Sequence, residues 1–516
     1  MTPRYTGHPI VDVGVATICA FCEKPDPAGL TREALVRVAE FLEREYFSGK
    51  LKAFLSVVFP NSLPFQAEIT PRHREDFVKR FRAEVLRAFE GAADQNAAGL
   101  RCSFCGDPAA RIVYRQHVPM ITGEGVLNFF PAGLGGMPIC GGCLLAVQTF
   151  PLGARRCHGR ALAVHCPDDH SFTYAFAQRF LSDNRSLLVL AQKTGEKYED
   201  AKAPRTLVVD ALLEIARRRG AFASTAPTLP SVTVYHLTNS GQGPDIDIFE
   251  LPSEVVSFVA AACRAGTADT WNSMVARAWE NPAAPRRAGA KRDSRNQQET
   301  QEPPPAPRAG KNRNFLYEAL FALRDKPADF IRTYFLRRAW RSARQSKNDP
   351  RAQYSAAREL ELVSWPLTHL FLKEVLGMDR ARIEAIRTLA DRVAEHIQSR
   401  SDGRLFQRLY MARRYDGLRA LLLRASRERV ASGEPPLIGF DEFVLIFEQG
   451  EEVPFIDWRL ARDLVLIRLI EQLRDFFRKE PAPLEAVIEP EDTEESGDQP
   501  ATASSQSLET GALRGA

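Results

Sequence analysis

Two short stretches, Cys102-Ser-Phe-Cys105-Gly106 and Cys140-Gly-Gly-Cys143, decide how the N-terminal half of this chain folds. In each stretch, two cysteines separated by two residues can turn both sulfurs toward one ion, while the adjacent glycines leave backbone N–H groups free to face the sulfurs. Four thiolates are a typical ligand set for tetrahedral zinc, and they leave no open position for a reactive water. The sequence therefore predicts one structural zinc ion. The alternative is four thiols buried in a core without metal.

The loop between the two stretches is longer than in a compact zinc ribbon. It has 34 residues between Cys105 and Cys140, against about 15 to 20 in the compact form. Its centre combines several glycines with Asn128, Phe129 and Phe130. Glycine lets a chain approach a DNA groove, asparagine can hydrogen bond to a base edge, and phenylalanine can stack or wedge between bases. We expect these residues to contact DNA; the alternative is that the two phenylalanines form the core of a small ribbon.

The remaining cysteines and the nearby histidines allow further interpretations. Cys19 and Cys22 lie in an apolar stretch, which favours buried core thiols over a metal site. A second group follows the zinc region and could replace one ligand or form another metal site: Cys157, His158, His165, Cys166 and His170. His165 with Asp168, Asp169 and His170 does not predict a metal-dependent hydrolase, because no second His–Asp pair stands at a suitable distance.

Composition and charge limit the class of protein. Apolar residues make up 44% and charged residues 26% of the 516 positions, as in ordinary soluble globular proteins of about three or four domains. The 69 basic and 65 acidic residues give a net charge of +4, but the last 36 residues hold eight acids and one arginine, so the rest carries about +11. Such an excess of positive charge suits contact with nucleic-acid phosphates.

Several functions are not indicated. The sequence has no apolar stretch of membrane-spanning length and no secretory signal at its start, so we expect a cytoplasmic protein without membrane contact. It also lacks the phosphate-binding loop GxxxxGK(S/T), the nucleophile elbow GxSxG and the zinc-protease motif HExxH. An enzyme built on a familiar motif is therefore disfavoured.

The chain is expected to have an α+β fold, with a mixed N-terminal region and an all-helical C-terminal bundle. Segments rich in proline, glutamine and charge, without large apolar residues, separate the folded parts. The predicted units are a mainly helical region at 1–101, a zinc-ribbon-like module with the inserted loop at 102–170, a helix-and-hairpin region at 171–280, a disordered basic linker at 281–312, the bundle at 313–480 and a disordered acidic tail at 481–516.

Hydrophobic periodicity and turn signals predict the individual elements. In the first part we expect helices at 12–21, 31–50, 71–92, 172–192 and 206–220, and a β-hairpin that pairs 232–237 with 246–251. After the linker, one helix carries an apolar stripe formed by Ile383, Ile386, Ala390, Val393 and Ile397. Helices at 329–345, 354–376, 405–425 and 458–477 would complete an antiparallel bundle, with the last at its centre. We expect this bundle to close its own core and to fold independently.

Basic side chains recur at positions suited to a nucleic-acid backbone. Arg155 and Arg156 follow the zinc region, where a metal-held scaffold would fix their direction toward target DNA. Within the helix expected at 329–345, one face carries Arg337, Arg341 and Arg344. A further set lies in the bundle: Arg404, Arg408, Arg413 and Arg414. We expect these side chains to contact phosphates; the alternative is a solvated basic surface.

The sequence resembles the CXXC-CXXC family of large subunits in type I-B CRISPR Cascade effector complexes. The resemblance rests on stretches that match the family pattern in order along the chain: Gly7-His-Pro-Ile-Val-Asp12-Val-Gly14, Pro60-Asn-Ser62, the two cysteine pairs with Asn128-Phe-Phe-Pro131 between them, and Tyr235-His-Leu-Thr-Asn239-Ser-Gly-Gln242-Gly-Pro244-Asp-Ile-Asp-Ile-Phe-Glu-Leu-Pro252. The C-terminal helical part agrees in character rather than in individual residues. The long linker, the acidic tail and Cys19 with Cys22 depart from the pattern.

The resemblance implies a non-catalytic subunit of a prokaryotic, cytoplasmic RNA-guided surveillance complex, in which guide pairing reads the target sequence and protein reads a short flanking motif on duplex DNA. The partners it implies are the guide crRNA, the target double-stranded DNA and its displaced single strand, the CRISPR backbone and 5′-handle-binding subunits, small subunits, and a helicase-nuclease. It also implies that the C-terminal bundle resembles the small subunit, which can be made separately from an internal start such as Met378.

Two alternatives from other classes stay open. A zinc-ribbon DNA-binding protein outside CRISPR would need only the four-cysteine region and would leave the C-terminal bundle without a role. A metal-dependent nuclease would need a second metal bound by carboxylate or histidine ligands.

Overall fold

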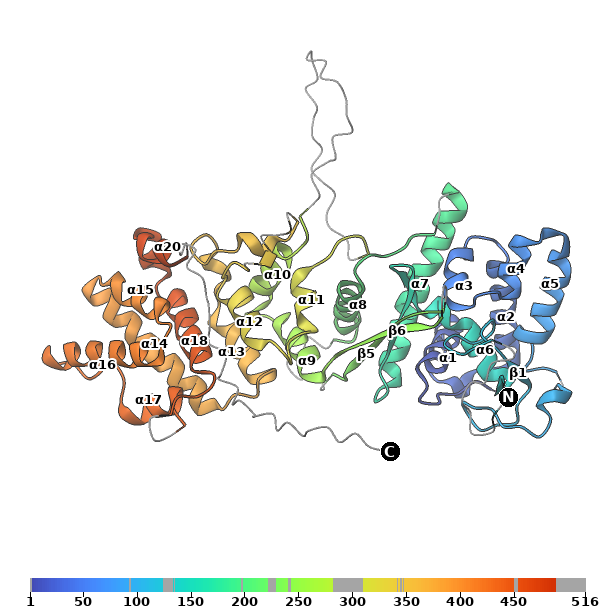
Figure 1. Ribbon diagram of the computed structural model, residues 1–516, viewed down its shortest axis with the longest axis horizontal. Coiled ribbons are helices and arrows are strands. Elements are labelled where there is room, and N and C mark those ends of the chain that lie inside the picture. The colour runs from blue at the N-terminus through green and yellow to red at the C-terminus, as the bar shows by residue number, and fades with distance from the viewer. Residues whose placement is uncertain are drawn as a thin grey trace, which may run out of the picture.

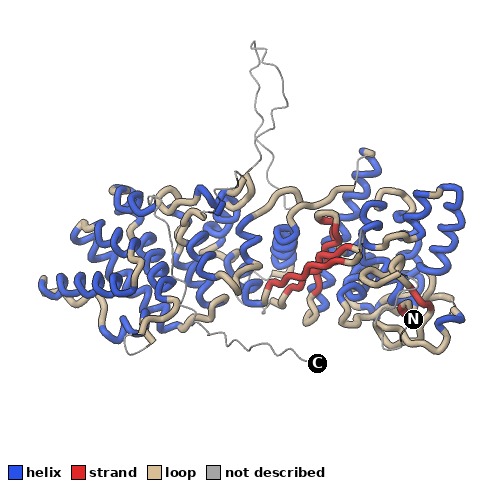
Figure 2. The backbone as a smooth tube through the Cα atoms, in the orientation of Figure 1, coloured by secondary structure: helices blue, strands red, loops and turns tan. Residues whose placement is uncertain are grey.

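The molecule is elongated and mainly helical (Figure 1). The computed structural model describes residues 2–91, 94–123, 133, 135–195, 198–220, 229–239, 243–281, 310–340, 342–343, 346, 348–449 and 453–488. The helix α1 (Pro9–Phe21) and its neighbours occupy one end, and α18 (Trp458–Gln472) and its neighbours occupy the other. A small sheet lies between them (Figure 2). The predicted α+β fold class is confirmed.

Helix α1 forms the centre of the N-terminal part because it is apolar on nearly all sides, and every residue from Ile10 to Ala20 is buried. Helices α6 (Gly141–Thr149) and α7 (His170–Thr194) pack against it. A Cβ atom at Gly14 would lie 2.0 Å from the Ala146 carbonyl oxygen, so only glycine lets the backbones of α1 and α6 come this close. The other helices of this part are α2 (Arg32–Tyr46), α3 (Lys52–Val58), α4 (Leu63–Ile69) and α5 (Arg74–Arg80).

The sheet has four antiparallel strands in the order β3 (Arg155–Cys157), β4 (Arg160–His165), β5 (Val232–Thr238) and β6 (Asp245–Leu251). Because successive residues of a strand point to opposite faces, β4 contributes to two cores. Leu162 and Val164 enter the core of the C-terminal part, whereas Ala161 and Ala163 enter the core around α1. The predicted hairpin is confirmed as β5 and β6. Strands β3 and β4 of the module expected at 102–170 belong to the same sheet as that hairpin, because β4 pairs with β5.

The C-terminal part continues a core that begins before the expected linker. Phe258 of α9 (Ser253–Ala262) packs edge-to-face against Phe371 of α13 (Trp365–Glu374), with ring centroids 5.3 Å apart. The backbones of Trp279 and Asn314 also form an antiparallel bridge. Neighbouring elements of the same core are α8 (Pro204–Arg218), α10 (Ala268–Arg277), α11 (Phe315–Leu320) and α12 (Pro327–Phe330). The expected division at 281–312 therefore does not separate two cores.

The far end of the molecule is a helical bundle centred on α18, as predicted. Helix α14 (Arg380–Arg400) packs against α18 and buries all five residues of the predicted stripe. The surrounding helices are α15 (Gly403–Met411), α16 (Tyr415–Ala431), α17 (Phe440–Phe447) and α19 (Arg474–Lys479). In the described part of the chain, no helix is both long and apolar enough to span a bilayer.

Several expected helices differ from the structure. The helix expected at 71–92 is α5 followed by a wider turn at Phe81–Leu86. The helix expected at 329–345 is shorter than predicted: α12 widens at Ile331–Phe335 and ends there, because Arg337 adopts a left-handed backbone with φ 55°. The helix expected at 405–425 is divided into α15 and α16, and that expected at 354–376 is reduced to α13.

The first residues of the expected disordered tail form a helix. Helix α20 (Ala482–Ile488) packs against α15 and buries Leu484 and Val487. These two apolar side chains, which the acidic composition of the segment obscures, explain why its start is ordered.

Candidate metal centre

The structure brings together the four cysteines that the sequence predicted as metal ligands. The sulfurs of Cys102, Cys105, Cys140 and Cys143, here called the four-cysteine cluster, all lie within 4.8 Å of one another. The Cys105 and Cys140 sulfurs are 3.5 Å apart. Three of the thiols are buried and Cys105 is half-buried. The cluster fits a metal ion with tetrahedral sulfur coordination.

The first cysteine pair is shaped by a tight turn. Gly106 has a left-handed backbone with φ +75°, and its N–H donates to the Cys102 carbonyl at 2.9 Å. The Cys102 N–H donates to the Asp107 carbonyl at 2.7 Å, which closes the turn. The Ser103 N–H donates to the carbonyl of Pro138, at 2.9 Å, and so ties this turn to the strand that leads into the second pair.

The second cysteine pair opens a helix. Cys140 is the N-cap of α6, and its sulfur accepts from the Cys143 N–H at 3.4 Å. A Cβ atom at Gly141 would lie 2.2 Å from the Phe89 backbone nitrogen, so glycine is needed there for close packing. The strands β1 (Arg111–Val113) and β2 (Met137–Ile139) pair antiparallel and hold the two cysteine pairs side by side.

Hydrogen bonds among the sulfurs lower the pKa of the Cys102 thiol and raise those of its neighbours. The hydrogen bond to the Cys102 sulfur is the largest cause that raises the pKa of the Cys140 thiol, to about 12. Hydrogen bonds to Cys102 and Cys140, followed by burial, likewise raise the pKa of Cys143. A divalent cation supplies the positive charge that allows cysteine ligands to lose their protons, so metal binding and thiol ionisation are coupled.

The residues expected to contact DNA near this cluster differ in their exposure to solvent. Asn128, Phe129 and Phe130 lie outside the described residues. Arg155 is buried in β3, and its Nη1 donates to Asn184 Oδ1 at 3.2 Å. The prediction of a DNA contact for Arg155 is therefore wrong, because its guanidinium belongs to an internal hydrogen-bond network. Arg156 is partly exposed and lies 3.7 Å from Asp200 in an ion pair.

The phosphate contact expected for Arg337 is also contradicted. Arg337 is fully buried, and its Nε donates to Glu359 Oε2 at 2.9 Å. The guanidinium carbon lies 3.6 Å from the ring centroid of Tyr354, so the charge is enclosed by its partners. Arg341 and Arg344 lie outside the described residues.

The basic residues of α15 and of the turn before α16 lie on the surface, as a phosphate contact would require. Arg404, Arg408, Arg413 and Arg414 are all exposed, while Leu405, Phe406 and Leu409 of α15 are buried. Arg414 lies 3.7 Å from Asp416 in an exposed ion pair. For the other three side chains, the described residues provide no hydrogen bond or ion pair, so their charges face solvent.

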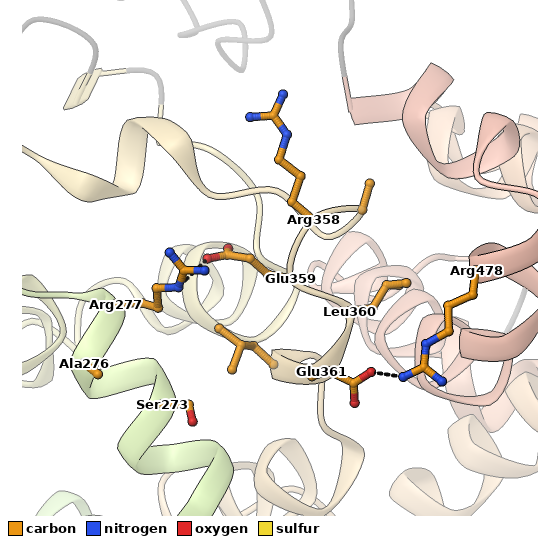
Figure 3. A pocket seen from close by; sticks show the side chains of 10 residues that line it. Ser273, Ala276, Arg277, Arg358, Glu359, Leu360, Glu361 and Arg478 are labelled. Atoms are coloured by element: carbon orange, nitrogen blue, oxygen red, sulfur yellow. Dashed lines mark hydrogen bonds and ion pairs between the residues drawn. The ribbon is translucent and has the colours of Figure 1, made fainter.

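A pocket of about 590 Å³ between α10 and α19 is less suited to an anion than its arginines suggest (Figure 3). Arg277 pairs with Glu359 at 3.6 Å, and Arg478 pairs with Glu361. Arg358 is the lining arginine for which the described residues show no ion pair, and Figure 3 shows it pointing away from the others. Carboxylates thus neutralise most of the positive charge in this pocket.

The other cysteines and histidines do not form one common site. Cys19 is buried within α1, as expected of a core thiol, and burial raises its pKa to about 12. In the described part of the chain, Cys157, His158 and Cys166 join no metal-ligating cluster. His165 and His170 do form one, with Asp12 as the third member. Sequence reasoning missed Asp12, although an aspartate inside an apolar helix is itself a signal of a buried polar role.

Comparison of the chain with models of known protein families, with curated proteins and with solved structures finds no match. The family resemblance stays a prediction.

Proposed function

We propose that this protein is a non-catalytic large subunit of an RNA-guided CRISPR surveillance complex of type I-B. In this role it recognises a short flanking motif on target duplex DNA, helps to open the duplex and supports recruitment of a separate helicase-nuclease. The four-cysteine cluster binds one zinc ion whose role is structural.

One observation carries the proposal: two stretches that resemble the family, although far apart in sequence, contact the segment that runs from Cys102 to Cys143. The ring of His8 lies edge-on to that of Phe104, between Cys102 and Cys105, at 4.8 Å. The Asn239 N–H donates to the Val57 carbonyl at 2.7 Å, and its own carbonyl accepts from Arg115 Nη2 at 3.0 Å.

These contacts join the matched stretches at 7–14 and 235–252 to the segment that runs from Cys102 to Cys143. His8 belongs to the stretch at 7–14, Val57 lies just before the stretch at 60–62, Arg115 follows the first cysteine pair, and Asn239 belongs to the stretch at 235–252. Residues that serve one function are expected to lie close together in the fold, and these contacts agree with that expectation.

The cluster supports the proposed role by holding both ends of the long loop. One end follows β1 and the other precedes β2, and these strands are paired. A Cβ atom at Gly136 would lie 2.4 Å from the Ile112 side chain, which shows how closely the returning chain packs. The proposal assigns flank recognition to Asn128, Phe129 and Phe130, within this anchored loop.

The positively charged surface at the other end suits the displaced strand. Arg404, Arg408 and Arg413 are exposed on α15 and at the start of the following turn. Exposed arginines of this kind bind phosphates without base preference and make binding sensitive to salt. We thus assign flank reading to the loop between β1 and β2 and strand retention to the exposed arginines of α15 and the turn after it, with guide crRNA and the other subunits as partners.

Isolation of the tagged full chain from its native cells tests the proposal. We expect it to co-purify with short RNAs that share a repeat-derived 5′ end, together with a repeating backbone subunit. Specific binding of duplex DNA by the chain alone, without RNA, would instead support a zinc-ribbon DNA-binding protein. Cleavage of DNA by the pure chain with added divalent ions would support a nuclease.

A further inference from the structure

A second cluster of metal-ligating groups lies outside the four-cysteine cluster. Ligand atoms of Asp12, His165 and His170 all lie within 4.8 Å of one another. The three residues come from α1, from the end of β4 and from the first position of α7. Asp12 is fully buried and His165 is 2% exposed, whereas His170 is half-buried at the edge of the cluster.

The carboxylate of Asp12 is held in a fixed orientation. Oδ1 accepts from the Thr6 N–H at 2.7 Å, and Oδ2 accepts from the Gly7 N–H at 3.0 Å. Oδ2 also lies 3.1 Å from Nε2 of His165. Such outer hydrogen bonds orient a ligating carboxylate in metal sites, and they keep its charge directed at one point.

Three buried polar groups on the residues of this region lack a hydrogen-bond partner among the described residues. Nδ1 of His170, Nδ1 of His8 and the hydroxyl of Tyr5 are buried, and the described residues provide no partner for them. The ring of His170 stacks on that of Tyr5, with centroids 4.1 Å apart, which fixes the imidazole plane. Buried polar groups are usually satisfied by protein, by water or by a bound ion.

We propose that Asp12, His165 and His170 bind a second divalent metal ion, and that this ion is zinc. Two imidazoles and one carboxylate form a known ligand set for catalytic-type zinc, with a fourth position for water or another ligand. Magnesium and calcium prefer oxygen ligands throughout, so the histidines disfavour them. The ion would join the N-terminal segment, the sheet and α7, which meet at this point. The inference does not depend on the proposed CRISPR role.

Metal content of the full chain, purified without a histidine tag, tests the inference. We expect two zinc ions per chain by elemental analysis. When cobalt replaces zinc, the four-cysteine cluster gives sulfur-to-cobalt charge-transfer bands, whereas the second site adds only weaker d–d bands. The variant His170→Phe keeps a ring against Tyr5 but removes the ligand nitrogen. It should lose one zinc per chain and keep the charge-transfer bands unchanged.

The matched control is His369→Phe, which makes the same change at another half-buried histidine, in α13. It should retain both ions. A wild-type chain with one ion, accounted for by the charge-transfer bands, would overturn the inference and indicate a hydrogen-bonded or hydrated cluster instead. A folded His170→Phe variant that retains two ions would overturn it equally. If that variant does not fold, the ion count and cobalt spectrum of the wild-type chain still decide.

Discussion

Cys140 has two roles at the scale of a single residue, since it offers a metal ligand and caps α6 through the Cys143 N–H. Structural zinc contributes about 10 to 16 kcal/mol in small peptides, comparable with a whole domain's stability of about 5 to 15 kcal/mol. We expect Cys140→Ser to lose the zinc of this cluster and to become insoluble or protease-sensitive. Elemental analysis and limited proteolysis measure both effects.

Cys19→Ser is the matched control, because Cys19 is equally buried but lies outside the cluster. Burying a hydroxyl there should lower stability by about 1 to 3 kcal/mol while the metal content stays that of the wild type. A folded Cys140→Ser protein that lacks the cluster's zinc yet resists protease like the wild type would contradict a structural role for that zinc.

Arg155 and Arg404 should respond in opposite ways to replacement by alanine. Arg155→Ala removes a buried charged hydrogen bond to Asn184 and should lower stability by about 1.5 to 3 kcal/mol, with little effect on nucleic-acid binding by the folded protein. Arg404→Ala should change the free energy of unfolding by no more than about 0.5 kcal/mol. It should weaken nucleic-acid binding and reduce the dependence of that binding on salt. Denaturant unfolding and binding titrations at several salt concentrations distinguish the two. Unchanged stability of Arg155→Ala would refute the structural assignment.

Local spacing predicted the cysteines correctly because a CxxC pair needs only one turn of chain to direct both sulfurs. The same kind of reasoning failed for Arg155 and Arg337, since position in the sequence does not show what a side chain meets in space. Asn184 and Glu359 are 29 and 22 residues away from these arginines. The site of Asp12 was missed for the same reason, because its partner His165 is 153 residues distant.

At the scale of elements, the contact between α1 and α6 depends on a single glycine. Gly14→Ala would place a Cβ atom 2.0 Å from the Ala146 carbonyl oxygen, so the two helices must move apart. We expect a loss of about 1 to 3 kcal/mol or more, as for other overpacked cores. Thermal and denaturant unfolding of the full chain measure this loss.

Gly417→Ala in α16 provides a matched control, because a Cβ atom there would meet nothing within 4 Å. At this open helical position alanine should increase stability by about 0.5 to 1 kcal/mol. If both substitutions change stability by the same amount and in the same direction, the close approach of α1 and α6 does not govern stability.

The spacing of apolar residues correctly predicted those elements in which a short stretch of sequence carries the whole pattern, such as α14 and the β5–β6 hairpin. It failed at 329–345, where the apolar and basic pattern is helical but the buried ion pair of Arg337 with Glu359 holds a non-helical backbone. Periodicity also predicted α15 and α16 as a single helix. The residues between them, Ala412 to Arg414, include no glycine or proline that would indicate the break. Tertiary contacts overrode local preference in these places.

At the scale of the whole molecule, one core extends across the expected linker. Phe258 and Phe371, which lie on either side of it, are in ring contact. We therefore expect a fragment of residues 313–488 to aggregate or remain partly unfolded when expressed alone, because it exposes the surface that covers 204–278. Co-expression with residues 1–280 should recover soluble protein that elutes as a complex.

Cleavage at a protease site inserted within 282–309 of the folded full chain provides the control. The two pieces should stay together in gel filtration, since the shared core holds them. Separation into two stable, folded pieces would contradict the continuous core and would favour an independent C-terminal bundle. Low-complexity composition predicted the linker segment, but composition could not show that folded residues on both sides pack together.

If the protein reads a flanking motif within an RNA-guided complex, as proposed, the flank must change the affinity for target DNA. The affinity of the reconstituted complex is measured for duplexes that share the guide-matched sequence and differ only in the flank. We expect one class of flanks to bind about tenfold tighter or more, and Asn128→Ala to reduce that preference, since a base-edge contact contributes about 1 to 3 kcal/mol of discrimination. Equal affinity for every flank, or affinity unchanged when the guide RNA is omitted, would contradict the claim.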